Sequence, residues 1–479
     1  MRKTKIVATM GPATDDPAVL RTMLKTGLDV ARFNFSHGTH SDHKLRVENL
    51  RRTCEETGMI VALLGDTKGP EIRLGDFADG KAELSTGSLL TLTTEPVMGD
   101  SGRVSVSYES LPEEVFPGNR ILLDDGLIEL SVESISGRDV TTRVTCGGPI
   151  SNKKGVNVPS ARLNMPYISD KDRSDLRFIV ENDFDIVAAS FVRSADDIMQ
   201  IRSEINNIDA NCSIRIIAKI ENAEGVANAD SILDVADGIM VARGDLGVEM
   251  AYEELPIIQK ELIKKAVYRG KEVITATQML ESMISCPRPT RAEASDVANA
   301  IFDGTGAVML SGETTVGNYP VEAVTAMAKI ADCIEGSIDY RERFIKSARI
   351  PEKSVTNAIS HATVTAAHEL GAAAILTVSM SGATARNVAK FRPLCPIIAC
   401  TPDPAVARRL KLEWGVIPLI MREVSGTVAL FAYAVGAALE SGYIKIGDLV
   451  VLTAGLPLKH SGTTNMLKIH EVGEEVLGL

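Results

Sequence analysis

The feature that most constrains the fold of this chain is a series of short apolar runs, rich in Val and Ile, that alternate with helix-like segments. Continuous apolar runs of this length predict strands buried on both faces, as in a parallel sheet. Eight such runs are the number in a (β/α)8 barrel, although a doubly wound sheet gives a similar alternation. The runs are residues 4–9, 30–35, 60–64, 186–191, 214–220, 239–241, 273–276 and 307–310.

Nearly every run ends in polar or charged residues. In (β/α)8 enzymes the active site forms at the carboxyl ends of the strands, so this pattern predicts a catalytic barrel rather than a purely structural one. The residues at these ends are Arg32, Asn34, Ser36, Asp66, Thr67, Ser190, Lys219, Glu221, Arg243, Asp245, Thr275, Thr277, Ser311 and Glu313.

Two further regions interrupt or follow the alternation. Residues 69–167 are rich in Thr, Val, Ser and Gly, with turns at 124–126 and 136–137 and period-two alternation at 89–93 and 103–107. A β domain inserted at the catalytic end is well placed to act as a lid. Strand-like runs at 373–379, 396–400 and 448–453 indicate a separate α/β unit. We therefore predict an α/β protein with a (β/α)8 TIM barrel (1–68 and 168–340), an inserted small β-barrel lid domain (69–167) and a C-terminal α/β regulatory domain (341–479).

Composition argues against two classes of binding partner, nucleic acids and membranes. The formal net charge of −12 argues against a nucleic-acid partner, because affinity for the phosphate backbone comes from clustered Lys and Arg. The most apolar stretch, 424–439, is too short and interrupted to span a membrane and predicts a buried helix. Seven Cys without a C-x-x-C pattern and no signal peptide indicate free thiols in a reducing compartment, hence a cytoplasmic protein.

Lys219 and Glu221 are two residues apart in a predicted strand, so both side chains face the barrel mouth. Asp245 follows the next strand and enters the same mouth. Two carboxylates from adjacent strand ends suit Mg²⁺, which keeps several waters and binds substrate phosphates. A simple Lys–Glu ion pair, and a helix cap by Asp245, explain the same residues equally well at this point.

A second polar group follows the first strands. Arg32, Asn34 and Ser36 share one strand face, and Asp66 and Thr67 end the following strand. Their oxygens suit a hard cation and leave Arg32 to meet an anion, although the pattern alone is only a polar strand end. Three histidines spaced three apart, His37, His40 and His43, indicate a turn and helix cap rather than a metal site, with His37 near a ligand.

Seven motifs in this order resemble the pyruvate kinase family over nearly the whole chain. No single motif would be specific, but the set is. They are KIVATMGP (5–12), RFNFSHG (32–38), DTKGPEIR (66–73), KIEN (219–222), MVARGDLGVE (240–249), ITATQML (274–280) and PTRAE (289–293).

The resemblance implies transfer of a phosphoryl group from phosphoenolpyruvate to ADP, which gives ATP and pyruvate in the last step of glycolysis. It also implies Mg²⁺ (or Mn²⁺), K⁺ and a homotetramer. The implied catalytic residues are Lys219, Arg32, Arg73 and Thr277. Arg32, Lys219, Gly244, Asp245 and Thr277 would bind the substrate, and Asn34, Ser36, His37, Arg73 and Lys154 the nucleotide. Glu221 and Asp245 would bind Mg²⁺, and Asn34, Ser36, Asp66 and Thr67 would bind K⁺.

Two positions refine these expectations. Some family members have Lys at the position of Glu71 and do not need K⁺, so Glu71 predicts K⁺ dependence. Ser379, Ser381, Gly382 and Thr384, with a second loop at 461–465, resemble the phosphate pocket of an allosteric effector. Ala383 stands where several members have a basic residue, so a different sugar phosphate from fructose bisphosphate, or AMP, is as good a candidate. A structural Ser/Thr-rich turn is the alternative.

The donor of the proton to the enolate stays open between Thr277 and a water held by Ser311 and Glu313. Two other classes share the carboxylates: a metal-dependent aldolase or lyase acting on pyruvate or phosphoenolpyruvate, and an inactive metabolite sensor. Neither needs the whole set of lid, Lys154, Lys219, Glu221 and Asp245 that this chain retains.

Overall fold

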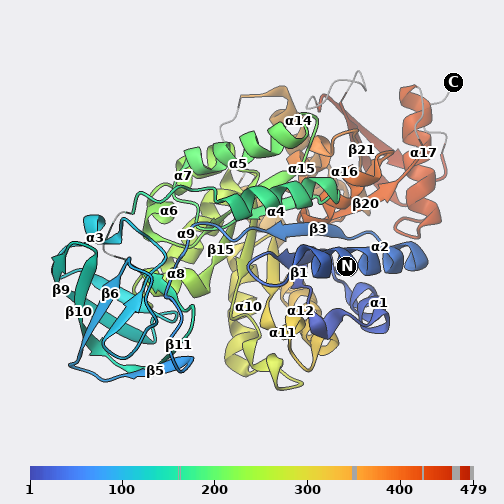
Figure 1. Ribbon diagram of the computed structural model, residues 1–479. Helices are drawn as coiled ribbons and strands as arrows, with labels where there is room; N and C mark the ends of the chain where they lie inside the picture. Colours follow the sequence, from blue (N-terminus) through green and yellow to red (C-terminus); the bar gives the residue numbers. More distant parts are fainter. Residues whose placement is uncertain (160, 162, 348–352, 423–425, 456–463, 475–479) are drawn as a thin grey trace.

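The computed structural model describes residues 1–159, 161, 163–347, 353–422, 426–455 and 464–474. Its centre is a closed barrel of parallel strands in the order β1-β17-β16-β15-β14-β13-β3-β2 (Figure 1). All eight predicted runs form these strands, which confirms the barrel and excludes the doubly wound sheet. The strands are β1 Lys5–Thr9, β2 Val30–Asn34, β3 Ala62–Asp66, β13 Ile186–Ala189, β14 Arg215–Ile220, β15 Gly238–Ala242, β16 Glu272–Ala276 and β17 Ala307–Leu310.

Helices surround the barrel and bury their apolar faces against the outer side of the strands. Several start at capping boxes, in which the side chain of Thr39, Ser169 or Thr290 accepts from the backbone of the first turn. The longer helices are α1 Pro17–Thr26, α2 His40–Thr57, α4 Asp170–Glu181, α5 Ala195–Ile208, α9 Leu255–Tyr268, α10 Arg291–Asp303 and α12 Pro320–Glu335. The short helical segments are η1 Pro12–Thr14, α6 Ala223–Ala227, α7 Ala229–Val235, α8 Arg243–Glu249, η2 Glu281–Ile284 and α11 Gly312–Thr315.

The amino end of the barrel is closed by the C-terminal part of the chain. Leu412 belongs to the apolar cluster that fills the barrel interior. Lys5 Nζ donates to the Val416 carbonyl at 2.7 Å, and Arg408 Nε lies 2.9 Å from Asp185 Oδ1. With this end plugged, only the carboxyl end of the barrel can open to a ligand.

The inserted region is β-rich, as predicted. One sheet has the order β4-β12-β8-β9-β10-β6-β7, and β11 pairs with β5. The edge strands β4 and β7 approach each other through a bridge between Leu74 and Val106, which draws the sheet toward closure. The strands are β4 Ile72–Arg73, β5 Lys81–Leu84, β6 Leu89–Thr93, β7 Arg103–Ser105, β8 Arg120–Leu123, β9 Ile128–Ser136, β10 Asp139–Cys146, β11 Gly148–Ser151 and β12 Gly155–Asn157, with the short helix α3 Leu111–Glu114.

The C-terminal unit is a sheet in the order β20-β19-β18-β21-β22 with helices packed around it. The strand-like runs in the sequence predicted the three inner strands of this sheet but neither of its two edge strands. β20 carries Pro418, which lacks a backbone N–H and is tolerated at an edge, and β22 carries Lys468 and His470. The elements are β18 Ala374–Val378, β19 Ile397–Thr401, β20 Val416–Ile420, β21 Leu449–Ala454, β22 Met466–Glu471, α13 Tyr340–Ser347, α14 Val355–Leu370, α15 Ala383–Ala389, α16 Pro404–Arg409, η3 Leu410–Leu412 and α17 Thr427–Glu440.

The helix predicted over 424–439 forms as α17, and residues 423–425 lie outside the described part. One of its faces is buried at Phe431 and Ala434, but Tyr433 and Leu439 are each 36% exposed, so the helix is not wholly buried. Among the residues that the structure describes, no helix combines the length and apolar character needed to cross a membrane. The exact limits of the three domains stay predictions.

Candidate active site

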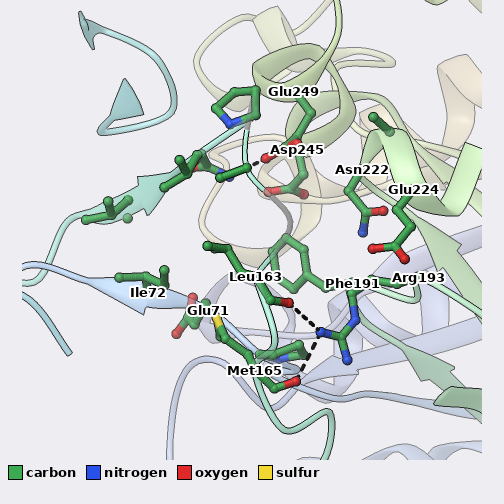
Figure 2. Close-up of a pocket in the computed structure, with 18 of the residues that line it drawn as sticks. Glu71, Ile72, Leu163, Met165, Phe191, Arg193, Asn222, Glu224, Asp245 and Glu249 are labelled. Carbon is green, nitrogen blue, oxygen red and sulfur yellow. Dashed lines mark hydrogen bonds between the residues drawn. The ribbon is translucent and has the colours of Figure 1, made fainter. Parts of the chain in front are cut away.

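A cleft of about 870 Å³ lies between the carboxyl end of the barrel and the inserted β domain (Figure 2). Four of the predicted site residues line it: His37, Arg73, Lys154 and Asp245. The other lining residues come from both sides, with Pro70, Glu71, Ile72, Asp124, Asp125 and 155–158 from the inserted domain and Phe191, Arg193, Asn222, Glu224 and Glu249 from the barrel.

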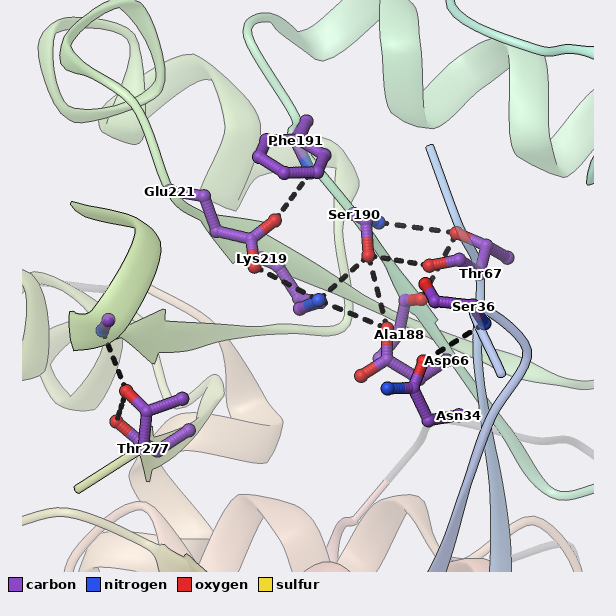
Figure 3. Close-up of polar contacts among 12 residues, drawn as sticks. Asn34, Ser36, Asp66, Thr67, Ala188, Ser190, Phe191, Lys219, Glu221 and Thr277 are labelled. Carbon is purple, nitrogen blue, oxygen red and sulfur yellow. Dashed lines mark hydrogen bonds and ion pairs between the residues drawn. The ribbon is translucent and has the colours of Figure 1, made fainter. Parts of the chain in front are cut away.

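Lys219 is the centre of a buried polar cluster at the strand ends (Figure 3). Its Nζ lies 2.9 Å from Glu221 Oε1 and 3.1 Å from Asp66 Oδ1, and it donates to Ser190 Oγ at 2.7 Å. These partners come from three neighbouring strands, because Lys219 lies in β14, Ser190 follows β13 and Asp66 ends β3. Lys219 is only 9% exposed, so the cluster is largely shielded from water.

The charges in this cluster are not evenly compensated. Burial would lower the pKa of Lys219, but the carboxylates of Asp66 and Glu221 outweigh burial and raise that pKa. Burial would likewise raise the pKa of Asp66, yet Arg32 and Lys219 hold it below the ordinary value. Burial raises the pKa of Glu221 to about 7, and the charge of Asp245 adds to this while Lys219 opposes it. Glu221 is therefore the carboxylate that most lacks a cation.

Glu221 and Asp245 fit a divalent cation with open coordination positions. Glu221 Oε2 accepts from Phe191 N at 2.7 Å, whereas its buried Oε1 has the Lys219 ion pair but no hydrogen bond within the described part of the chain. Asp245 lies in the first turn of α8 and lines the cleft. The described residues contain no group of three or more His, Cys, Asp or Glu side chains arranged as metal ligands. Two carboxylates suit Mg²⁺, which keeps waters and takes substrate oxygens, better than zinc.

Four of the predicted oxygen ligands meet at the ends of β2 and β3. Asn34 and Asp66 are paired in register across the two strands. The Asn34 amide oxygen accepts from Ser36 N at 3.1 Å, and Thr67 Oγ1 accepts from Ser190 N at 3.2 Å. Figure 3 shows all four side chains close together. Amide, hydroxyl and carboxylate oxygens are the donors that a hard cation such as K⁺ prefers.

Arg32 was expected to be left for an anion, but the protein already occupies part of its guanidinium. Arg32 Nε donates to Asp66 Oδ2 at 2.7 Å, and one terminal nitrogen donates to Thr9 Oγ1 at 2.9 Å. The side chain is buried and held rigid by these two bonds. A rigid, permanently charged guanidinium is well suited to a phosphate or carboxylate ligand.

Thr277 is held in an unusual backbone conformation. Thr277 and Gln278 have φ values of 66° and 54°, which are uncommon for residues other than glycine and more so for a β-branched one. Arg243 donates to the Thr277 carbonyl at 2.7 Å and is itself paired with Asp296 at 2.7 Å. Gly244 N donates to Thr277 Oγ1 at 2.8 Å. These contacts maintain the strain and fix the hydroxyl beside the start of α8.

Both cations of the inserted domain that were predicted to meet a nucleotide have protein partners. Glu71 accepts from Arg73 through both carboxylate oxygens, at 2.7 and 2.8 Å, and also pairs with Lys68 at 2.8 Å. Lys154 Nζ lies 2.8 Å from Asp124 Oδ1. A phosphate entering the cleft would compete with these carboxylates for the two cations.

Three contributors to the site were not singled out from the sequence. Ser190 was recognised only as a polar strand end, yet its hydroxyl joins Lys219 to Thr67, whose carbonyl it reaches at 2.6 Å. Phe191 has a φ of 53°, which turns its backbone N–H toward Glu221. Arg193 donates to the carbonyls of Leu163 and Met165, at 3.4 and 3.0 Å (Figure 2). No local sequence pattern predicts a contact between the barrel loop that carries Arg193 and the end of the inserted domain, where Leu163 and Met165 lie.

Replacing Arg193 with Leu is expected to raise about tenfold the KM for the nucleotide predicted to bind Arg73 and Lys154, since it removes charge-assisted bonds worth about 1.5–3 kcal/mol that tie the inserted domain to the barrel. The matched control is Arg202→Leu, because Arg202 bonds Val235 and Asp237 within the barrel. Steady-state kinetics with both variants checks this. Equal KM values for the two variants would contradict it.

The two loops predicted to form an effector pocket do meet. Ser379, Ser381, Gly382 and Thr384 lie between β18 and the first turn of α15, and Thr384 Oγ1 is 3.1 Å from Thr464 Oγ1 of the second loop. Gly382 has a φ of 74°, which favours glycine. Residues 461–463 lie outside the described residues.

The closed barrel, the inserted β domain, the buried Lys–carboxylate cluster at the strand ends and the neighbouring cleft define a (β/α)8-barrel enzyme with its site at the carboxyl end. Residues 1–324 match the family described as "Pyruvate kinase, barrel domain", and residues 357–470 match "Pyruvate kinase, alpha/beta domain". The chain belongs to the pyruvate kinase family, a family of phosphotransferases.

Individual relatives agree. The chain is 50% identical over 475 residues to a pyruvate kinase from Geobacillus stearothermophilus, covering 99% of this chain and 81% of the relative. It is 48% identical over 473 residues to a pyruvate kinase from Clostridium acetobutylicum, covering 98% of this chain and 100% of the relative.

Proposed function

We propose that the protein transfers the phosphoryl group of phosphoenolpyruvate to ADP, giving ATP and pyruvate in the last step of glycolysis. The observation that carries this proposal is the buried cluster of Lys219, Asp66 and Glu221 near Asp245, because Asp245 lines the same cleft as Arg73 and Lys154. Such an arrangement holds a phosphorylated substrate on one side and a nucleotide on the other.

The resemblance to the family gives each residue a proposed role, and its charge and place in the structure support that role. Lys219 and Arg32 bind the phosphoryl oxygens and balance the charge that spreads over them during transfer. Gly244, Asp245 and Thr277 bind the rest of the substrate, while Arg73, Lys154 and His37 bind the nucleotide with Asn34 and Ser36. Glu221 and Asp245 would hold Mg²⁺ or Mn²⁺, and Asn34, Ser36, Asp66 and Thr67 would hold K⁺. The divalent ion supplies Lewis-acid stabilisation of negative charge.

The reaction breaks the bond between phosphorus and the enol oxygen and forms one between phosphorus and a terminal oxygen of ADP. The electron pair of the broken bond stays on the enol oxygen, and the resulting enolate takes a proton at its methylene carbon to become pyruvate. Thr277 stays one candidate for positioning that proton. The other is a water beside Ser311, whose buried Oγ has no hydrogen-bond partner among the described residues and whose backbone N–H donates to Glu313 at 2.7 Å.

The test is pyruvate formation from phosphoenolpyruvate and ADP with Mg²⁺ and K⁺ present. The proposal requires turnover that depends on both substrates and yields one ATP per pyruvate. Release of pyruvate without ADP, with inorganic phosphate as the co-product, would indicate a phosphatase instead. Absence of turnover, with and without sugar phosphates and AMP, would favour the lyase or sensor hypotheses.

Omitting K⁺ at constant ionic strength is expected to lower the rate at least about tenfold, because the oxygens of Asn34, Ser36, Asp66 and Thr67 would lack the cation that they are arranged to bind. Glu71 supports this expectation, since a carboxylate cannot replace a monovalent cation. Rates in KCl are compared with rates in choline chloride free of Na⁺. Full activity in choline chloride would refute K⁺ dependence.

We also propose that a sugar phosphate or AMP binds near Ser379, Ser381, Gly382 and Thr384 and controls activity allosterically, which the contact between the two loops supports. A homotetramer and a cytoplasmic location are further proposals. The tetramer rests on family resemblance, and the location is supported by seven cysteines that are all free thiols.

A further inference from the structure

The last residue of β2, Asn34, and the loop that leads from it to α2 carry three of the proposed ligand-binding residues, Asn34, Ser36 and His37. The beginning of the loop is a tight turn, because the Asn34 side-chain oxygen accepts from Ser36 N at 3.1 Å and the Asn34 carbonyl accepts from His37 N at 3.3 Å. Gly38 then has a φ of 77°, a conformation that side chains disfavour. The loop therefore has a specific shape, and the peptide after His37 decides whether that shape continues to the helix.

His43 reaches back from the beginning of α2 to this peptide. Its Nε2 lies 2.9 Å from the His37 carbonyl oxygen. A carbonyl can only accept, so the ring donates from Nε2–H. His43 is 4% exposed, and its Nδ1 has no hydrogen-bond partner within the described ranges. The hydrogen bond to His37 is thus the single polar interaction of this ring that the structure describes.

Aromatic neighbours fix the orientation of the ring. The centroid of His43 is 4.6 Å from that of Phe35 and 6.2 Å from that of Phe33, with the latter pair edge to face. Phe33 and Phe35 belong to the same β2 and loop segment that carries the ligand oxygens. Burial lowers the pKa of His43, although the bond to His37 opposes this, so a neutral ring with one defined tautomer fits the site.

We propose that His43 is a positioning residue, which holds the loop of Asn34, Ser36 and His37 in the shape that binds K⁺ and nucleotide. This inference rests on the proposed function of those three residues. A loop that is already shaped before binding loses less conformational freedom when its ligands arrive. His43 touches neither the substrate nor the nucleotide in this role, and it acts only through the His37 carbonyl.

The position of the donor allows a sharp test. The side-chain nitrogen of Gln is as many bonds from Cα as His Nε2, whereas that of Asn corresponds to Nδ1. His43→Gln is therefore expected to keep the bond, and its K⁺ and ADP affinities should stay within about twofold of the wild type. His43→Asn and His43→Leu lack a donor at that position, and both are expected to weaken K⁺ and ADP binding about fivefold, the equivalent of one ordinary hydrogen bond.

The measurements separate positioning from general damage to the fold. ADP binding is measured by calorimetry, and K⁺ binding by the rise of Tm in KCl relative to choline chloride. The KM for phosphoenolpyruvate should change by less than about twofold, because the bonds of Arg32 and Lys219 do not involve this loop. If His43→Asn does not fold, the comparison is made between His43→Leu and His43→Gln.

The matched control is His40→Gln, three residues earlier on the same helix. His40 bonds Asp175 at 2.7 Å, stacks on Phe178 and packs edge to face on Phe35, but within the described residues it makes no hydrogen bond to the His37 carbonyl. Its variant should leave K⁺ and ADP binding unchanged. The inference would be overturned if all three His43 variants bound K⁺ and ADP as tightly as the wild type. It would also be overturned if the Gln variant lost as much affinity as the Asn and Leu variants.

Failure of this inference can be told apart from failure of the proposed function. If the wild-type protein makes no pyruvate, the proposed function fails, whatever the variants do. If the wild type is active and binds K⁺ and ADP with the same affinity as His43→Asn and His43→Leu, only the positioning role of His43 fails.

Discussion

Replacing Lys219 with Met is expected to lower kcat by at least about a thousandfold, the effect of removing a buried cationic donor from a developing negative charge. The ammonium is also the shared partner of Asp66, at 3.1 Å, and of Glu221, at 2.9 Å. Methionine has a similar length and no charge. Its introduction leaves Asp66 with the Arg32 ion pair and the Ser190 hydroxyl, and removes from Glu221 the only cation that this chain brings to it within the described residues.

Two measurements distinguish lost chemistry from a lost fold. The Tm of the Lys219→Met variant should stay measurable and cooperative, because the buried carboxyl of Glu221, with a pKa already raised to about 7, can take up a proton in place of the missing cation. The control is Lys260→Met, since the Lys260 side chain is 57% exposed and its ion-pair partner, Asp303, does not belong to the Lys219 cluster. A Lys219→Met enzyme that keeps a tenth of wild-type kcat would contradict the role assigned to Lys219.

Replacing either Glu221 with Gln or Asp245 with Asn is expected to raise the half-saturating Mg²⁺ concentration at least about a hundredfold. Changes to groups that only support metal ligands already cost about 10- to 100-fold, and a direct ligand should matter more. Both substitutions preserve shape. In the Glu221→Gln variant, the amide would still offer an oxygen to the Phe191 N–H that now donates to Glu221 at 2.7 Å. The expected loss is therefore one of charge rather than of packing.

The matched control for the metal site is Glu224→Gln. Glu224 lines the same cleft three residues further along the chain, but it is not one of the two proposed ligands. Rates are measured against free Mg²⁺, and Mn²⁺ binding is followed by electron paramagnetic resonance, which does not depend on turnover. If all three variants share the wild-type Mn²⁺ affinity, the metal does not bind at Glu221 and Asp245.

Local pattern was sufficient to find the Lys219–Glu221 pair. Residues two apart in a strand face the same side, and the apolar run before them identified the strand. Their partners could not be found in this way. Asp66 comes from a strand more than 150 residues earlier in the chain, and Ser190 from the strand between them, so their meeting depends on the closure of the barrel.

The interaction partners of charged side chains were harder to predict than the strands and loops on which those side chains lie. Arg32 was expected to meet an anion, and no protein partner was predicted for Glu71. In the folded protein Arg32 is bonded to Asp66 and Thr9, and Glu71 is bonded to Arg73 and Lys68. The sequence does not show which residue will pair with a charged side chain. The ion-pair partner depends on which strand ends and loops the fold brings within about 4 Å.

The sequence by itself indicated the barrel, its eight strands, the β-rich insertion and the inner strands of the C-terminal sheet, because burial of apolar residues produces a local period that can be read along the chain. The family followed from a different signal, the seven motifs that resemble pyruvate kinase in the same order. Only the tertiary structure decided the contacts of Lys219 with Asp66 and Ser190, the bond from His43 to His37, the anchoring of the insertion by Arg193 and the plug of Leu412 in the barrel. These contacts join segments that have no common period, and they form because a closed barrel with one blocked end brings its strand ends and loops to the same place.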